Sequence, residues 1–289
     1  MDVLGIGQSV YDLTFVIDGD IVLDNKYRSK KMIECMGGPC TNAIYFCGLW
    51  GLDCQIISRV GSDLYGNNII DSFKKIKVMT DSIFVSKQNT SISCIVSNGS
   101  SRTIFNRPME EELFKVVWPV SSPKVILYDN HELAVMTESI KRYPLAIKVM
   151  DGDRFKEEYV PLMKEMDYLI VSQSFAYEAT GIECLSENYY DVLKGLEKYN
   201  SKVVVVTLSS EGLIYLKDDK VVHVPSIKVN SVDPSGAGDV FHGAFCYGLC
   251  NNFALEDNLV FSSKVAALST TKYGGQLSIP SKEEYYESE

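Results

Sequence analysis

The second half of the chain alternates short, almost continuous apolar runs with longer segments in which apolar and polar residues are mixed. The apolar runs predict strands at 125–128, 146–150, 168–171 and 202–208. The mixed segments predict helices at 133–143, from about 156, and at 187–198. Strands that are apolar throughout are typical of a parallel sheet covered by helices on both faces. The pattern therefore predicts an α/β fold with a doubly wound, mostly parallel sheet flanked by helices.

The first part of the chain departs from this alternation. A short buried strand at 3–7 is followed by three apolar runs separated by Asp, Gly and Asn, rather than by a helix. These runs predict short strands at Phe15–Ile17, Ile21–Leu23 and Lys31–Cys35. Further on, Ser91–Val96 and Arg102–Phe105 flank the turn-rich segment 97–101 and predict a hairpin. Together these segments predict a small accessory β-sheet.

A glycine-rich turn near the C-terminus carries the clearest chemistry. Strand-like runs at Val221–Val224 and Ile227–Val229 precede it, and apolar residues at helical spacing follow it. The turn itself is Gly236-Ala237-Gly238-Asp239. Backbone amides at a helix start have no intrahelical partner, and the helix dipole adds partial positive charge, so the turn should attract a phosphate. Asp239 in the first helical turn is then placed to take a proton from an attacking hydroxyl.

A simpler interpretation of the same stretch is that Asp233 and Ser235 cap a helix and the glycines only form a loop. A Gly-x-Gly turn alone would not distinguish the two. The combination of two acids and three glycines between a strand and a helix favours the anion-binding interpretation.

Charge and cysteine usage narrow the class of protein. The net charge of -10 argues against a nucleic-acid or anionic-membrane partner, because binding polyanions requires a basic surface. The sequence has eight cysteines but no Cys-x-x-Cys pair, and only three histidines, which argues against a zinc site. No basic-then-apolar leader begins the sequence. Unpaired-looking cysteines without such a leader predict a reducing cytoplasm.

Two motifs resemble those of the ribokinase-like (PfkB) carbohydrate kinase family. The stretch 233–243 is similar to the family's C-terminal signature, with Pro234 in place of the usual Thr. Gly37-Gly38, followed by Asn42 and an apolar helix to about Trp50, is similar to its N-terminal signature. The resemblance spans nearly the whole chain and implies one ribokinase-like domain, 1–289. It also implies a β lid over the sugar site, formed from about 13–36 and 88–107.

The resemblance implies transfer of the γ-phosphoryl group of ATP to a hydroxyl of a small sugar of the fructose or ribose type, or of a sugar derivative. Asp239 would be the base, and the amides of Gly236, Ala237 and Gly238 would form an anion hole. Asp12, Gly38 and Asn42 would hold the acceptor; without the resemblance, Asp12 is a turn or cap residue and the other two belong to a capped helix.

Two further residues are candidate acceptor-binding residues with good alternative explanations. Asp151 follows a predicted strand, in a sequence similar to the family's Asp-x-Asn-x-Arg, and turn chemistry explains it equally well. Arg102, in the predicted hairpin, could reach a charged or hydroxylated substrate, although an exposed hairpin arginine is usually only solvated.

Nucleotide-binding residues follow from the same resemblance. Thr207, Ser209 and Gly212 match a turn that borders the nucleotide, with Ser209 where Gly is usual. A helix predicted at 258–272 would lie beside the adenine. Lys264 is unusually large for that helix, and Gly274 follows it.

Magnesium is implied together with ATP, but the metal-organising part of the family pattern is absent. The Asn-x-x-Glu motif of many members falls here on Ser172 and Phe175, neither of which is an acid. The absence of this motif puts the expected arrangement of Mg²⁺ in doubt, but not the reaction, and the metal ligands stay unassigned.

Three alternatives therefore stay open at this stage: a sugar kinase, a nucleoside kinase of the same fold, and a non-catalytic regulator that binds a sugar or nucleotide. Family members often pair their lids, so a homodimer through the lid is expected.

Overall fold

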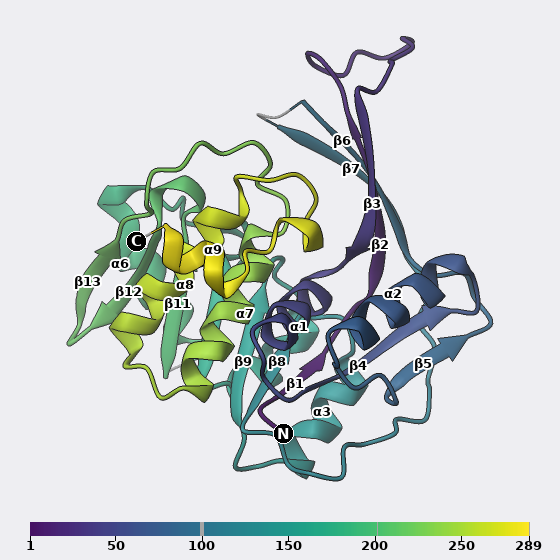
Figure 1. The fold of residues 1–289 in the computed structure, drawn as a ribbon. Coiled ribbons are helices and arrows are strands. Elements are labelled where there is room, and N and C mark those ends of the chain that lie inside the picture. Colours follow the sequence, from purple (N-terminus) through teal and green to yellow (C-terminus); the bar gives the residue numbers. More distant parts are fainter. Residues whose placement is uncertain (99–100, 201, 289) are drawn as a thin grey trace.

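The computed structural model describes residues 1–98, 101–200 and 202–288, and the larger of its two sheets extends through most of the chain. Within these residues the strand order is β13-β12-β11-β10-β9-β8-β1-β4-β5 (Figure 1). The strands are β1 (Val3–Ile6), β4 (Cys54–Gly61), β5 (Ile83–Ser86), β8 (Val125–Tyr128), β9 (Ile147–Gly152), β10 (Tyr168–Ser172), β11 (Val203–Thr207), β12 (Leu213–Lys217) and β13 (Lys220–Val224). Every pair from β5 to β11 is parallel, and β12 and β13 add antiparallel pairs at one edge. The predicted doubly wound, mostly parallel sheet is confirmed.

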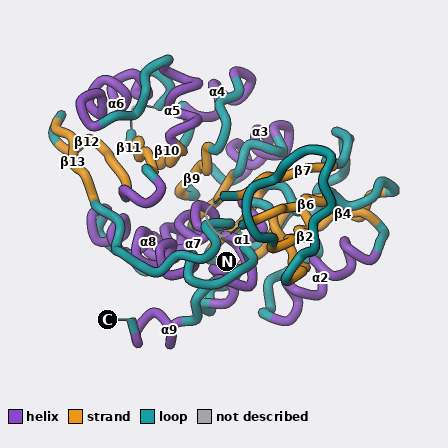
Figure 2. Tube along the Cα trace, turned by 90° about the horizontal axis from the view of Figure 1, so that it is seen from above, coloured by secondary structure: helices purple, strands orange, loops and turns teal. Residues whose placement is uncertain are grey.

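Helices cover both faces of this sheet (Figure 2). On one face lie α1 (Pro39–Leu49), α2 (Leu64–Lys75), α7 (Ala237–Cys250) and α8 (Leu255–Ser269). On the other lie α3 (Leu133–Arg142), α4 (Val160–Met163), α5 (Gln173–Thr180) and α6 (Tyr189–Glu197). Short elements complete the chain: η1 (Glu157–Tyr159), η2 (Ser186–Asn188), η3 (Ser209–Glu211), η4 (Gln276–Ser278) and α9 (Lys282–Glu287).

The parallel strands from β4 to β11 in the sheet order each contribute to both cores. Leu127 packs with α1 and α7, whereas its neighbours Ile126 and Tyr128 pack with the helices of the opposite face. Successive side chains of a strand point to opposite faces, so a strand covered on both sides must be apolar at every position. Burying each such side chain stabilises the fold by about 1.5–3 kcal/mol. This requirement explains why the apolar runs of the sequence locate these strands.

The second sheet stands away from the first (Figure 1). Its order is β3-β2-β6-β7, with β2 (Val10–Val16), β3 (Lys31–Gly37), β6 (Ile92–Ser97) and β7 (Arg102–Arg107). The β2–β3 and β6–β7 pairs are antiparallel, and β2 pairs with β6 in parallel. The predicted accessory sheet is therefore present, and we call it the lid sheet. Its proposed function as a lid, and the domain boundaries drawn around it, stay predictions.

Two predicted strands are wrong. Ile21–Leu23 is not a strand, because β2 and β3 already pair from Val10 with Gly37 to Val16 with Lys31. The residues between them form the connection at the end of that ladder. Ile227–Val229 is also not a strand; Pro225 follows the end of β13 and lacks the N–H needed to continue the ladder. In the turn predicted at 97–101, Gly99 and Ser100 lie outside the described residues.

The helix predicted at 258–272 begins and ends earlier, as α8. It is followed by the loop that carries Gly274. The helix predicted from about 156 is the 3-10 turn η1 and the single turn α4.

Candidate active site

The N-termini of α1 and α7 lie side by side at the carboxyl end of the large sheet, which is where open α/β sheets bind ligands. Their close contact depends on Gly243, where a Cβ would lie 2.7 Å from the carbonyl oxygen of Ala43. This packing brings Asn42 of α1 against Asp239 of α7, and the Asn42 Nδ2–H donates to Asp239 Oδ2 at 2.7 Å. Two of the predicted site residues are thus in direct contact.

The environment of Asp239 shifts the pKa of its carboxyl group in two opposing directions. Burial raises the pKa of Asp239, whereas the hydrogen bond from Asn42 and the positive charge of Arg102 lower it. The Oδ1 atom of Asn42 is buried and has no hydrogen-bond partner among the described residues. A buried carbonyl oxygen beside a carboxylate needs a donor, and a substrate hydroxyl would supply one.

The anion turn is held by a carboxylate that the sequence suggested only as a cap. Asp233 accepts the backbone N–H of Ser235 at 3.0 Å and that of Gly274 at 2.9 Å, so it fastens the turn to the loop that follows α8. The N-cap of α7 is Gly236, in the left-handed conformation (φ 79°), and no side chain caps the helix. The interpretation of Asp233 and Ser235 as helix caps is therefore wrong.

The turn is also shaped for close approach to its backbone. A Cβ on Gly236 would lie 3.0 Å from the Cα of Gly275, so this position requires glycine both for space and for its φ. A Cβ on Gly238 would meet nothing within 4 Å. Gly238 thus leaves open space beside the first amides of α7, as an anion-binding helix start requires.

Asp12 lies inside strand β2 and not in a turn, so its interpretation as a turn or cap residue is wrong. Its carboxylate covers Gly37, where a Cβ would lie 2.0 Å from Asp12 Oδ2. Gly38 has φ 102°, and a Cβ there would lie 2.5 Å from the carbonyl oxygen of Gln8. Gly37 thus makes room for Asp12, and Gly38 for the backbone of Gln8, at the entrance to α1.

Burial raises the pKa of Asp12 to about 7, and the negative charge of Asp239 acts in the same direction. A hydrogen bond from Ser93 and the charge of Arg102 oppose this rise in pKa. Arg102 therefore acts on both carboxylates from β7, although its side chain is exposed. Its direct contact with a substrate stays a prediction.

Asp151 has a partner behind the anion turn. Its Oδ2 lies 3.2 Å from Nδ1 of His242, and that nitrogen donates to the carbonyl oxygen of Gly238 at 2.8 Å. Burial lowers the pKa of His242 to about 4, so the ring is neutral near pH 7. This contact places Asp151 of β9 beside the first turns of α7. Contact of Asp151 with the acceptor stays a prediction.

Sequence reasoning missed Asp129, which is buried and directly follows β8. Its Oδ2 accepts the backbone N–H of Gln8 at 2.9 Å and that of Cys40 at 3.2 Å, so it joins the end of β1 to the start of α1. Gly7 leaves the space, since a Cβ there would lie 2.3 Å from the carboxylate. An acid immediately after an apolar strand is the signal that could have located it.

The predicted nucleotide-binding residues occupy three segments. Thr207 ends β11 and its hydroxyl donates to the carbonyl oxygen of Val171. Ser209 has φ 53°, a left-handed conformation that favours glycine, which explains why glycine is the expected residue there; the structure offers no reason for the serine. A Cβ on Gly212 would lie 2.0 Å from the carbonyl oxygen of Val224, and Gly274 has φ 86°. The Lys264 ammonium lies 4.6 Å from the ring centroid of Tyr285 in α9. Binding of the nucleotide by all five residues stays a prediction.

The described residues contain no ready-made metal cage. Across residues 1–98, 101–200 and 202–288, no group of three His, Cys, Asp or Glu side chains is placed to hold a metal ion. Ser172 caps α5 and Phe175 is buried, while Glu178 is paired with Arg154. Exposed Asp153 lies near enough to raise the pKa of Asp239. Because Mg²⁺ is usually held by one or two carboxylates, phosphates and water, this arrangement fits a metal bound largely through the nucleotide.

Comparison with known proteins decides the family. The sequence pattern of the pfkB family carbohydrate kinases matches residues 2–282. The chain belongs to the pfkB carbohydrate kinase family. It is 26% identical to a ribokinase of Lactococcus lactis, over 84% of this chain and 82% of that protein. It is 25% identical to a deoxyribokinase of Salmonella typhi, over 99% and 98% of the two chains.

Solved structures share the fold of this pfkB kinase. A putative ribokinase from Agrobacterium tumefaciens superposes with a TM-score of 0.87 at 21% identity, covering 99% of this chain and 96% of that one. An Arabidopsis thaliana ribokinase complexed with ribose and ATP gives 0.79 at 18% identity, covering 99% and 97%. A Methanocaldococcus jannaschii nucleoside kinase gives 0.77 at 16% identity, covering 99% and 97%. None of the helices within the described ranges of this kinase has the length and apolar character required to cross a membrane.

Proposed function

We propose that this pfkB kinase transfers the γ-phosphoryl group of ATP to a hydroxyl of a small sugar of the fructose or ribose type, or of a sugar derivative. The observation that carries the proposal is the Asn42–Asp239 contact beside the anion turn, with Asn42 Oδ1 left without a donor. A hydroxyl placed there can donate to Asn42 or Asp239 while its oxygen faces the bound phosphate.

The phosphoryl transfer can be followed bond by bond with these residues. The acceptor oxygen attacks the γ-phosphorus, the new oxygen–phosphorus bond forms as the bond to the β-phosphate oxygen breaks, and ADP leaves. The hydroxyl proton passes to Asp239, whose raised pKa suits it to accept a proton. The amides of Gly236, Ala237 and Gly238 would stabilise the charge on the transferred group. Magnesium, when bound, would neutralise phosphate charge.

Polarity around Asp239 favours a sugar over a nucleoside. Asp12, Asn42 and Arg102 present carboxylate, amide and guanidinium groups that match several hydroxyls. The aromatic ring next to Asp12 in sequence, Tyr11, points to the opposite face of β2 and stacks on Tyr65 with ring centroids 4.8 Å apart. It therefore cannot serve as a clamp for a nucleobase beside Asp12.

The test is ADP release from ATP and Mg²⁺ with a panel of ketohexoses, pentoses, sugar acids and nucleosides. Turnover with a sugar, lost in Asp239→Ala and kept in Asp257→Ala, supports the proposal. Asp257 is the matched control, since it is an exposed acid in the first turn of the neighbouring helix α8. Turnover with a nucleoside alone would establish the nucleoside kinase instead. Binding of sugar or nucleotide without any turnover would establish the non-catalytic regulator.

Exposed apolar side chains on one face of the lid sheet support the proposed homodimer. Met32 and Phe105 are 51% and 60% exposed and lie on the same face as Phe15, as the strand register shows. A second copy of this sheet would cover them. Sedimentation at several concentrations tests this, and an unchanged mass after Met32→Glu with Phe105→Glu would contradict it.

We also retain the cytoplasm as the proposed location, since all eight cysteines are free thiols, which suits a reducing compartment.

A further inference from the structure

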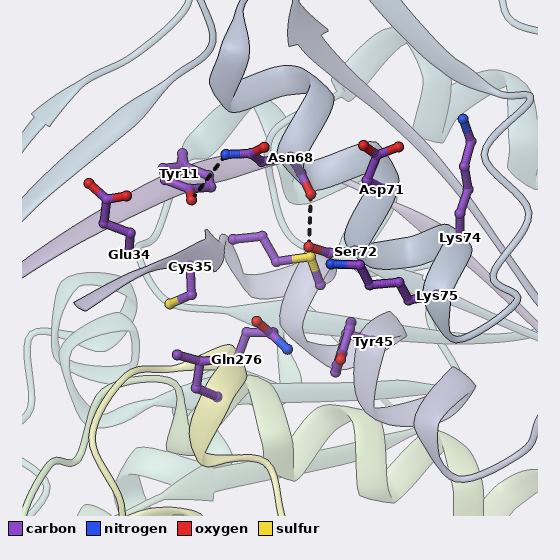
Figure 3. Close-up of a pocket in the computed structure, with 12 residues that line it drawn as sticks. Tyr11, Glu34, Cys35, Tyr45, Asn68, Asp71, Ser72, Lys74, Lys75 and Gln276 are labelled. Atoms are coloured by element: carbon purple, nitrogen blue, oxygen red, sulfur yellow. Dashed lines mark hydrogen bonds between the residues drawn. The ribbon is translucent and has the colours of Figure 1, made fainter.

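A cavity of about 710 Å³ lies at the edge of the lid sheet, between strand β3, helices α1 and α2, and η4 (Figure 3). We call it the lid-edge pocket. Its lining includes Cys35, Met36, Tyr45, Ser72, Lys75 and Gln276. Its volume is within the range of small-molecule sites. Tyr11 also lines it, whereas Asp12, Asn42 and Asp239 do not, so the pocket is separate from the candidate active site.

The charges around the pocket define what it could bind. The ammonium of Lys75 points into it, whereas the side chains of Glu34, Asp71 and Lys74 point outward (Figure 3). Lys75 takes part in no ion pair within the described part of the chain. The charged group that points into the pocket is therefore the Lys75 ammonium, which favours an anionic group in the ligand.

Neutral polar groups complete the lining. The Ser72 hydroxyl donates to the carbonyl oxygen of Asn68 at 2.8 Å, so its oxygen remains as an acceptor for a ligand hydroxyl. The Tyr45 hydroxyl and the Gln276 amide lie on the opposite side (Figure 3), and the apolar side chain of Met36 also lines the pocket. An anionic group beside a hydroxylated carbon chain matches this set.

Two walls of the pocket belong to segments that also shape the active site. Cys35 is the cross-strand partner of Asp12. Gln276 directly follows Gly275, whose Cα would lie 3.0 Å from a Cβ on Gly236 of the anion turn. A molecule in the pocket would therefore contact both β3 of the lid sheet and η4. Cys35 in β3 pairs with Asp12, which would hold the acceptor, and Gln276 in η4 follows Gly275, which packs against the anion turn.

We propose that the lid-edge pocket binds a small hydroxylated organic anion, a phosphate monoester or a carboxylate, and that its occupancy holds β3 against α2 and η4. The site is distinct from those for ATP and the acceptor. Its occupancy changes the affinity for the acceptor, because the position of β3 sets the position of the Asp12 carboxylate relative to Asp239.

Binding is measured by calorimetry with glycerol 3-phosphate and with glycerate, which share a hydroxylated three-carbon chain and differ in the anionic group. Wild type is compared with Lys75→Gln and with Lys74→Gln, the matched control that removes the same charge one residue away. Wild type and Lys74→Gln should bind at least one of the two anions. Lys75→Gln should bind it about tenfold or more weakly, since a charge-assisted hydrogen bond is lost.

Binding of the phosphate monoester alone, of the carboxylate alone, or of both would support the proposal and identify the anionic group. No binding to wild type overturns it. Equal binding by wild type and Lys75→Gln places the ligand elsewhere, and equal loss in both lysine variants shows only diffuse surface charge; either result also overturns it. Once a sugar is turned over, the bound anion should change its KM in wild type and not in Lys75→Gln. The calorimetry needs no turnover, so its failure is distinguishable from failure of the proposed kinase reaction.

Discussion

Replacing Asn42 with Leu should move the acidic limb of the pH–rate profile to higher pH. The Asn42 Nδ2–H donates to Asp239 Oδ2 at 2.7 Å, and this bond stabilises the ionised carboxylate. Leucine has a similar volume and no donor. Without the hydrogen bond, burial acts on the Asp239 carboxyl unopposed by Asn42, so its pKa rises further and less of the base is ionised near neutral pH.

The size of the shift follows from the strength of that bond. Hydrogen bonds to charged groups contribute about 1.5–3 kcal/mol, and one pKa unit corresponds to about 1.4 kcal/mol. The Asp239 side chain is partly exposed, so water replaces some of what is lost. We therefore expect the lower end of the range, about one pH unit.

The assay is kcat/KM against pH, from about pH 5 to 9, by ADP release with the sugar found in the panel. A change in KM alone would not distinguish a lost substrate contact from a shifted pKa of Asp239. The position of the acidic limb reports that pKa directly. Asn251→Leu at the other end of α7 is the matched control, because its Nδ2–H donates only within that helix end, to Tyr247. An acidic limb that stays in place or moves to lower pH in Asn42→Leu would refute the reasoning.

Three further outcomes are expected. Gly236→Ala should lower the melting temperature and raise the KM for ATP, because φ at this position is 79° and the added Cβ would crowd Gly275. The control Gly238→Ala should fold with wild-type stability, since a Cβ there meets nothing within 4 Å. Equal melting temperatures of the two variants would contradict this prediction. Ser209→Gly should raise the free energy of unfolding by about 1 kcal/mol in urea titrations, because φ 53° is left-handed, and a loss of stability would show that no strain is relieved. The folded pKa of Asp12, about 7, exceeds its unfolded value, so the folded state binds more protons and stability is lost as pH rises from about 4 to 7. Asp12→Asn has no carboxyl group at this position and so escapes that loss. Between about pH 5 and pH 8, the unfolding free energy of Asp12→Asn minus that of the wild type should therefore increase by on the order of a few kcal/mol. A difference between the two proteins that does not change with pH would rule out the raised pKa.

Much of the fold could be predicted because it is encoded locally. Strand β8 is buried on both faces and apolar throughout, and β11 is apolar from Val203 to Val206, so these runs are visible without a partner. The anion turn is equally local, since Gly236 and Asp239 lie within one strand-to-helix passage. The errors fell where pairing decides the structure: Ile21–Leu23 is apolar enough for a strand but lies beyond the end of the β2–β3 ladder.

The assembly of the site was decided by tertiary structure. Asn42 and Asp239 are 197 positions apart, and their contact depends on how closely α1 and α7 pack at Gly243. Asp129 has no motif around it, and only the meeting of β1, β8 and α1 shows what its carboxylate holds.

The sequence by itself determined the alternation of strands and helices around the parallel sheet, the family resemblance and the position of the anion turn, because these depend on neighbouring residues. It also supplied the residue types of the candidate site. Only the tertiary structure decided which side chains meet and how their pKa values shift, because burial and charge at Asp12 and Asp239 come from elements distant in the chain.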